Sequence, residues 1–360
     1  MQSMQELINE RTARFLNTAQ VRLPIMNAPM ADASGPEMAA AVCRAGGLGV
    51  LAGDELEPKA LSEAIDEVRR LAGENARFAV NIRVAPAKKA TAEQQELQRK
   101  MLDALEDLAA DVGVEAGTTL ALPDFDAQFD VLVQKQVPVV SVTFGGLREE
   151  YDDRLKQAGM LWMGTATTLR EAKVLRAAGA DIVVVQGIEA GGPRLNFENT
   201  SEEAVLGMSV LVAHASRATQ LPVVASGGIG TPDQVYAALA AGAGAVMVGS
   251  VLLRTFESRV SSAFKDLLPL VSDVSMRLTS CFNGRPTRVY PTDLVRALEE
   301  SGLRFAPYPL QREVMRPILS AARFQGREDL ACLPAGQVAM LAREESVEQA
   351  LNRLMVFVVN

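Results

Sequence analysis

Eight short runs of apolar residues recur between residues 23 and 256, each separated from the next by a longer amphipathic stretch. They occupy residues 25–30, 49–52, 78–84, 138–144, 161–165, 182–186, 222–226 and 245–249. Most of these runs are continuously hydrophobic, as is typical of parallel strands buried on both faces. Helical patterns lie between them, at residues 35–45, 58–71, 149–157, 169–178, 201–219 and 232–241. Eight strands with intervening helices over about 250 residues predict an α/β fold, a closed (β/α)₈ TIM barrel rather than an open doubly wound sheet.

Two segments depart from this repeat. The connection at residues 88–136 is long and charged, and we expect it to carry extra helices. After residue 256 the pattern of buried strands stops, and a mixed helical tail follows with turn-rich breaks at residues 283–286 and 306–309. We therefore predict a barrel domain at residues 1–256 and a C-terminal helical cap at residues 257–360, packed over the mouth of the barrel.

Charge and composition exclude several classes of protein. The formal net charge of −8 and the pI near 5.0 argue against a nucleic-acid partner, because phosphate backbones are bound by clustered Lys and Arg. The N-terminal residues lack an apolar signal-peptide core, and the longest apolar runs are too short to span a bilayer. Three cysteines without CxxC spacing indicate neither a disulfide framework nor a metal site. We expect a cytoplasmic protein with a small-molecule substrate, and a homo-oligomer is compatible with the sequence.

Glycine-rich loops follow the last two expected strands. Residues 226–232 include Gly227 and Gly228, and Gly249 is followed directly by Ser250. Glycines let backbone N–H groups approach an anion closely, and the loops after strands seven and eight form the recurrent phosphate site of this fold. The simpler alternative is that these glycines only make tight turns. We favour a phosphate site, because both loops carry the signal in the right order.

Two other strand ends carry unusual sequences. The first strand ends in Asn27-Ala28-Pro29-Met30, where a proline and a small alanine leave backbone groups accessible to a flat ligand. The sixth is followed by Gln-Gly-Ile-Glu-Ala-Gly-Gly-Pro-Arg at residues 186–194. Together with the glycine loops, these segments resemble the nitronate monooxygenase (2-nitropropane dioxygenase) family. The resemblance extends to residues 45–49, 80–81, 141–145, 164–165, 283–286 and 335–337, and so spans almost the whole chain.

The resemblance implies a site for FMN in the barrel. Ala28 and Met30 would lie along the flavin ring, and Asn81 and Gln186 would hydrogen-bond its polar edge. The residues that would line the mouth are Gly191 and Gly192, and those that would hold the phosphate are Gly227, Gly228, Gly249 and Ser250. The alternative for Asn81 and Gln186 is that each satisfies buried backbone groups. We favour the ligand, because a polar residue that ends an apolar barrel strand more often faces one.

One position departs from the family pattern, which continues Glu-Ala-Gly-Gly-His where this chain has Pro193. Proline has no titratable group and no backbone N–H, so it cannot act as a general base. The only histidine, His214, falls in a helical run on the outside of the barrel and is predicted to be structural or solvent-facing. Arg194 is a candidate catalytic residue that could favour an anionic substrate, although a solvated loop arginine is the simpler interpretation. Glu189 is either a replacement acid or base or a residue that shapes the loop.

Three functions follow from this pattern. The leading hypothesis is an FMN-dependent enzyme that oxidises a nitronate or a similar stabilised carbanion with O₂, since a nitronate is already deprotonated and does not need the missing base. The second is a reductase that passes hydride from NAD(P)H through FMN to an enoyl thioester or a quinone. The third is a non-catalytic flavin-binding protein. No GxGxxG motif opens a strand–helix unit, so a separate dinucleotide-binding domain is not expected.

Overall fold

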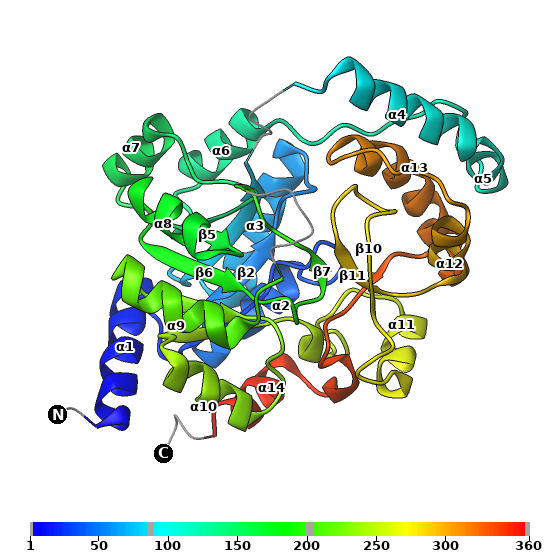
Figure 1. Cartoon of the computed structure of the whole chain (residues 1–360). Helices are drawn as coiled ribbons and strands as arrows, with labels where there is room; N and C mark the ends of the chain where they lie inside the picture. The colour runs from blue at the N-terminus through cyan, green and yellow to red at the C-terminus, as the bar shows by residue number, and fades with distance from the viewer. Residues whose placement is uncertain (1–2, 85–88, 199–204, 357–360) are drawn as a thin grey trace.

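The computed structural model describes residues 3–84, 89–198 and 205–356, with eight parallel strands at its centre (Figure 1). The strands are β1 (Ile25–Asn27), β2 (Gly49–Ala52), β3 (Phe78–Arg83), β4 (Val139–Thr143), β5 (Leu161–Ala166), β6 (Ile182–Gln186), β8 (Val223–Ser226) and β9 (Ala245–Val248). They are hydrogen-bonded in the order β1-β9-β8-β6-β5-β4-β3-β2. The predicted (β/α)₈ barrel is confirmed, and each predicted strand end lies within three residues of the observed one.

The barrel closes between β1 and β2, where backbone pairing is short. A single parallel bridge joins Met26 to Leu48. Beside it, the buried side chain of Asn27 donates to Val50 O at 2.8 Å and accepts from Val50 N at 2.8 Å. This amide takes the place of a second backbone pair, so Asn27 belongs to the closure of the barrel rather than to the cavity above it.

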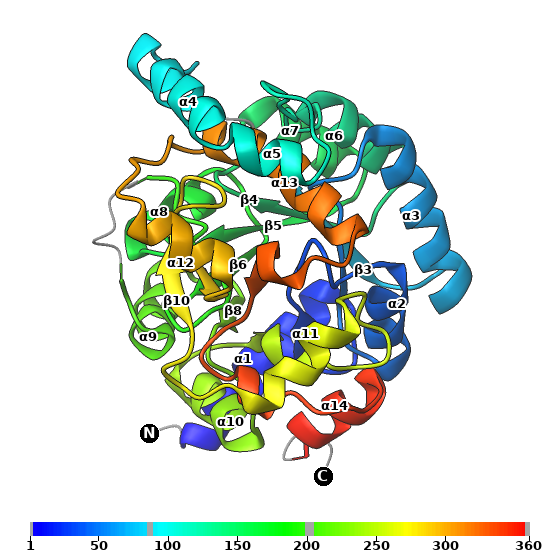
Figure 2. The same cartoon turned by 90° about the vertical axis from the view of Figure 1, so that its right-hand side faces the viewer.

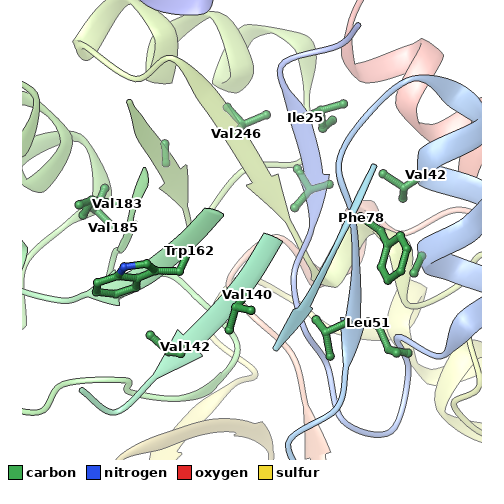
Figure 3. Packing of buried hydrophobic residues seen from close by; sticks show 14 of the residues in the cluster. Ile25, Val42, Leu51, Phe78, Val140, Val142, Trp162, Val183, Val185 and Val246 are labelled. Atoms are coloured by element: carbon green, nitrogen blue, oxygen red, sulfur yellow. The ribbon is translucent and has the colours of Figure 1, made fainter. Parts of the chain in front are cut away.

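The outward-facing side chains of the strands pack against a ring of helices (Figure 3). The ring contains α2 (Pro36–Ala45), α3 (Pro58–Ala72), α6 (Phe125–Gln134), α7 (Glu149–Gln157), α8 (Leu169–Ala177), α9 (Met208–Thr219) and α10 (Pro232–Ala241). The last helix, α14 (Val347–Leu354), packs beside α2 and α10, and its buried residues Val347 and Leu351 join the same hydrophobic core. The chain therefore returns to the barrel after the cap and completes its outer layer.

The interior of the barrel is layered by polarity. Inward-facing residues at the amino ends of the strands are apolar, such as Val139, Ile182 and Ala245. Helix α1 (Met4–Ala19) covers this end and inserts Phe15, which is fully buried, into the same cluster. Because side chains alternate along a strand, inward positions recur every second residue, and several of those nearest the carboxyl ends are polar. They include Asn81, Ser141, Thr165, Gln186 and Ser226, all of them buried. Apolar side chains thus fill the barrel at the amino ends of the strands, and polar side chains gather at the carboxyl ends.

The cap lies over the polar end (Figures 1 and 2). It comprises α11 (Ser262–Leu267), β10 (Arg277–Thr279), β11 (Thr287–Tyr290), α12 (Asp293–Glu300), α13 (Leu310–Phe324), β12 (Leu333–Pro334) and the short 3₁₀ helices η2 (Leu268–Leu270), η3 (Glu328–Leu330) and η4 (Ala339–Leu341). The long third connection adds α4 (Ala92–Ala104) and α5 (Glu106–Asp111), whose apolar side chains share a core with α12 and α13. Strands β10, β11 and β12 pair with β7 (Gly192–Pro193) in a small antiparallel sheet.

Two features differ from the sequence-based expectation. The tail contains the three short strands β10–β12, which were not predicted because each has only two to four residues. The helix expected at residues 201–219 begins at Met208; residues 201–204 lie outside the described residues, and 205–207 are not helical. Gly207 is extended at the N-cap, and a carboxylate described below caps the first N–H. None of the helices in the described ranges is long and apolar enough to cross a bilayer.

Candidate active site

A cavity opens at the carboxyl ends of the barrel strands, beneath the cap. Residues from both the barrel loops and the cap line it, including Ala33 and Leu253 from the barrel side and Phe264 and Val338 from the tail. The ten residues that the resemblance implied for flavin binding all line this one cavity: Ala28, Met30, Asn81, Gln186, Gly191, Gly192, Gly227, Gly228, Gly249 and Ser250. Segments more than 200 residues apart in sequence, from Ala28 to Ser250, therefore meet at one place.

The glycine loops form the end of the cavity beside β8 and β9. Gly227 and Gly228 have φ angles of 105° and 70°, in the left-handed region that favours glycine. Among the described residues, no hydrogen-bond acceptor faces the N–H groups of Gly227, Gly228 or Gly249. Gly249 is the N-cap of a short 3₁₀ helix, η1 (Ser250–Leu252), and the Ser250 hydroxyl accepts from Gly336 N at 2.7 Å. We call residues 227–229, 249 and 250 the glycine end.

Helix α10, which follows the first glycine loop, closes its own N-terminus. Gln234 Oε1 accepts from Gly230 N at 2.8 Å and from Thr231 N at 3.1 Å, and Pro232 has no N–H to offer. This capping box satisfies the donors that a helix start would otherwise present. An anion at the glycine end would therefore meet the loop N–H groups rather than α10.

The polar strand ends divide between ligand-facing and structural roles. Gln186 Nε2 donates to Pro193 O at 3.0 Å, and Gln186 Oε1 accepts from Leu195 N at 3.1 Å, so this amide fixes the following loop. Asn81 Oδ1 accepts from Ser141 Oγ at 3.0 Å, whereas the Asn81 amide nitrogen has no acceptor in the described part of the chain. Within the described residues, the Asn81 amide nitrogen is therefore free to donate a hydrogen bond to a ligand in the cavity.

The loop at residues 187–193 lies between barrel and cap. Both carboxylate oxygens of Glu189 lie 3.0 Å from Met208 N, so Glu189 caps α9 across the loop. A Cβ added to Gly191 would lie only 2.4 Å from the Ala335 carbonyl carbon, and β7 pairs Pro193 with Thr287 of the cap. These contacts assign Glu189 a loop-shaping role and leave Pro193 facing the cavity.

The structure places Arg194 away from this cavity. Its side chain is only 5% exposed, and Nη1 donates to Gln186 O at 3.0 Å and to Gly187 O at 2.8 Å. Burial lowers the pKa of Arg194 to about 10. The Arg194 guanidinium thus binds the backbone behind the loop, and Arg194 lines a second pocket that it shares with Glu299 and Phe305.

The opposite end of the cavity, at β2, β3 and β4, is lined by Asp54 and Arg83, and further arginines lie behind them. Arg83 Nη2 lies 2.6 Å from Asp54 Oδ2 and 2.7 Å from Glu55 Oε1. Glu55 also pairs with two arginines of α13, Arg312 and, at 3.6 Å, Arg316. Burial alone would lower the pKa of Arg83, but Asp54 and Glu55 outweigh it and raise this pKa, so Arg83 stays charged.

A stack of flat groups completes this end. Phe144 lies 5.0 Å from Tyr308, ring centroid to centroid, and the Arg285 guanidinium lies 4.5 Å from Phe144 and 4.7 Å from Tyr308. Phe144 has a φ angle of 66°, which is uncommon for a residue with a side chain and turns its ring into the cavity wall. We call Asp54, Glu55, Arg83, Arg285, Arg312 and Arg316 the arginine end.

Comparison with known proteins agrees with this geometry. The model of the nitronate monooxygenase family matches residues 13–356. Nitronate monooxygenase from Pseudomonas aeruginosa is 33% identical, over 96% of this chain and 98% of its own length. A probable nitronate monooxygenase from Bacillus subtilis is 32% identical, over 94% and 97%. The chain belongs to the nitronate monooxygenase family.

Solved structures support this assignment. Nitroalkane oxidase from Streptomyces ansochromogenes has a TM-score of 0.86 and 35% identity, over 96% of this chain and 98% of that one. FabK from Thermotoga maritima has a TM-score of 0.74 and 27% identity, over 95% and 94%. The resemblance found in the sequence is confirmed, as is the prediction of an oxidoreductase. The family is one of flavoproteins.

The base used by the family has no evident replacement in the described residues. No histidine lines the cavity, and His214 is exposed on α9, outside the barrel, as predicted. The acidic groups that line the cavity are Asp32, Asp54 and Glu189, and each already contacts a cation or an N–H. In the described ranges, no group of three or more His, Cys, Asp or Glu side chains could hold a metal ion.

Sequence analysis did not find the arginine end. One signal was available for Arg83, because positions 79, 81 and 83 of β3 alternate inward and Arg83 follows Asn81 by two residues. No local signal connects Glu55 with Arg312, which are more than 250 residues apart in sequence. Only the docking of the cap brings them together.

Proposed function

We propose that this protein binds FMN in the cavity and oxidises a small nitronate, or a similar stabilised carbanion, with O₂. The observation that carries the proposal is the unpaired set of N–H groups at Gly227, Gly228 and Gly249, on the phosphate side of a cavity lined by every residue implied for the flavin. Bound FMN supplies a two-electron acceptor that a carbanion reduces and O₂ reoxidises.

The glycine end fits one phosphate and offers nothing for a second nucleotide. Its donors are backbone N–H groups on two short loops, which is the phosphate arrangement typical of this fold. Ala28 and Met30 would lie along the ring, and the free Asn81 nitrogen would donate to its polar edge. These features support FMN over FAD.

The rest of the chain acts by enclosing and orienting the substrate. The cap covers the mouth and limits water access, and the loop at residues 187–193 is held from both sides by Gln186, Glu189 and β11. Pro193 offers no base at the position where the family has its histidine. A substrate that arrives without its α-proton avoids this deficiency, so nitronates are favoured over neutral nitroalkanes.

The test begins with the visible spectrum of the purified protein and mass spectrometry of the chromophore released by acid. The expected result is FMN; FAD, or a protein that cannot be reconstituted with FMN, would refute the cofactor assignment. Anaerobic mixing with propyl-2-nitronate should then bleach the flavin, and O₂ should restore its colour. The control is 2-nitropropane, the neutral form of the same compound, which should react much more slowly.

Two alternatives predict other outcomes of the same experiment. Bleaching by NADH or NADPH and not by the nitronate would support the reductase, with which the similarity to FabK is consistent. A bound flavin that none of these donors reduces would support a non-catalytic flavin-binding protein.

A further inference from the structure

We propose that Arg83 is the residue that binds the oxygen atoms of an anionic substrate. This inference rests on the proposed function, because it names the group that receives the substrate of that reaction. Strands β3 and β4 lie directly across the barrel from β8 and β9 in the order of the eight strands. Arg83 therefore faces the cavity from the side opposite to the glycine end.

Arg83 has donors that the protein does not use. Its Nη2 group is committed to Asp54 at 2.6 Å and to Glu55 at 2.7 Å. The guanidinium also lies within hydrogen-bonding reach of the Tyr308 hydroxyl, and Nη1 is not among the described polar atoms buried without a partner. Since Arg83 lines the cavity, its guanidinium can donate to an anion that occupies it.

Asp54 and Glu55 prepare this side chain for binding. Two carboxylates at Nη2 hold the guanidinium in place, so little rotational freedom remains to be lost when Nη1 binds a ligand. They also keep it charged, as described above. The Nη1 group can donate a charged hydrogen bond to an oxygen of a planar oxyanion such as a nitronate or a carboxylate.

The surroundings favour an anion at this point. The arginine end contains four arginines against two carboxylates, in a chain with a net charge of −8. Arg285 stacks on Phe144 and Tyr308, and no carboxylate of the described residues forms an ion pair with it. Three guanidinium nitrogens here are buried without a partner among the described residues: Arg83 Nε, Arg285 Nε and Arg312 Nε. Such orphaned groups are rare in proteins and indicate a polar partner that completes the site.

The experiment measures binding and turnover separately in the FMN-loaded protein. Nitrate, a planar oxyanion that cannot be oxidised, is titrated against wild type, Arg83→Met and Arg83→Lys. Loss of a charged hydrogen bond predicts that Arg83→Met raises the Kd for nitrate and the KM for propyl-2-nitronate by roughly 10- to 100-fold, with a smaller change in kcat. Arg83→Lys keeps the positive charge but loses the planar guanidinium, so its Kd and KM should fall between those of wild type and Arg83→Met. The matched control is Arg296→Met, which removes the same charge from an exposed position on α12 and should bind nitrate as wild type does.

Each outcome decides the proposal. An unchanged nitrate Kd in Arg83→Met, or an equal loss in Arg296→Met, would overturn it while leaving nitronate oxidation intact. Conversely, a wild-type protein that does not oxidise nitronates but loses nitrate binding in Arg83→Met would refute the proposed function and keep the anion site. If Arg83→Met fails to retain FMN, Arg83→Lys answers the same question.

Discussion

The two ends of the cavity offer hydrogen-bond donors in different ways. The glycine end uses backbone N–H groups from two short loops, residues 227–229 and 249–250, with no charged side chain. The arginine end uses the guanidinium of Arg83 on β3, which is held by carboxylates of the loop after β2; one of them, Glu55, also binds α13 of the cap. Backbone donors do not titrate and are placed by local chain geometry. Side-chain donors depend on ion pairs between segments that only docking brings together, so the two ends should respond differently to mutation, pH and loss of the cap contacts.

The largest effect is expected on FMN affinity, from a negative charge placed at the glycine end. Gly249→Asp should weaken FMN binding by about 100-fold or more, because two like charges a few ångströms apart repel strongly where water is largely excluded. Gly249 suits this test: its φ of −120° tolerates a side chain, and an added Cβ would lie 3.3 Å from Ala28 Cβ and 3.5 Å from Met30 Sδ. The measurement is the Kd for FMN from fluorescence quenching.

The control for Gly249→Asp is Gly249→Asn, which has the same size without the charge and should lose much less affinity. Gly228→Asp is a poorer choice, since Gly228 has a φ of 70° and its Cβ would lie 2.9 Å from Glu189 Cβ. Equal losses in the Asp and Asn variants would mean that space, and not a phosphate charge, explains the glycines.

The next largest effect is expected on protein stability, from a change at the arginine end that should leave FMN binding at the glycine end unaffected. Glu55→Gln removes the carboxylate shared by Arg83, Arg312 and Arg316, and leaves buried guanidinium groups without their counter-charge. We expect the free energy of unfolding to fall by about 2–3 kcal/mol, near the lower limit for a broken buried ion pair because Glu55 is partly exposed. Urea denaturation measures it. The Kd for FMN should stay close to wild type; a large loss of FMN affinity would show that the ends are not independent.

The same pair of proteins gives a pH test. Burial alone would raise the pKa of Glu55, but Arg83 and Arg312 outweigh it and hold this pKa below its usual range. A carboxylate whose folded-state pKa is depressed contributes stability above its unfolded pKa and loses it as pH falls through the folded value. The stability difference between wild type and Glu55→Gln should therefore be full above about pH 5 and shrink in more acidic solution. A difference that does not change with pH would contradict the ionic role of Glu55.

A smaller effect, on the turnover of neutral nitroalkanes, is expected at Pro193, which lines the cavity between the glycine end and the arginine end. Pro193→His places an imidazole on the cavity wall, where it should raise turnover of neutral 2-nitropropane by about 10-fold, a part of the 10²–10⁴-fold typical of a supported general base. Turnover of the preformed nitronate should change much less, since its proton is already gone. The decisive quantity is the ratio of the two rates in wild type and variant. If FMN stays bound and the ratio does not move, the cavity has been rebuilt for other chemistry.

The smallest functional effect is expected at Arg194. Arg194→Met removes hydrogen bonds to Gln186 O and Gly187 O, so it should lower the melting temperature. Its effect on the Kd for nitrate should be far smaller than that of Arg83→Met, because Arg194 does not line the main cavity. A comparable loss of nitrate binding would return Arg194 to the substrate site, as the sequence alone suggested.

The sequence by itself determined the barrel and most of the residues that meet at the cavity. Continuous apolar runs separated by amphipathic stretches are local patterns, and they place all eight strands. Once the strands are placed, the fold requires their carboxyl ends to meet. One cavity must therefore be lined by Ala28, Asn81, Gln186 and the glycine loops. The sequence also showed that Pro193 stands where the family has its base.

Only the tertiary structure decided the rest. The two-residue strand β7 exists because β11 pairs with it, and Glu189 acts on α9 rather than on a substrate because the loop folds back toward Met208. Arg194 and Arg83 could not be distinguished by residue type. Arg194 turns behind its loop to backbone carbonyls, whereas Arg83 is held at the cavity by Asp54 and by Glu55, which the cap arginine Arg312 also binds. The physical reason is that periodicity records which face a side chain takes on its own element, while its partners come from segments tens to hundreds of residues away.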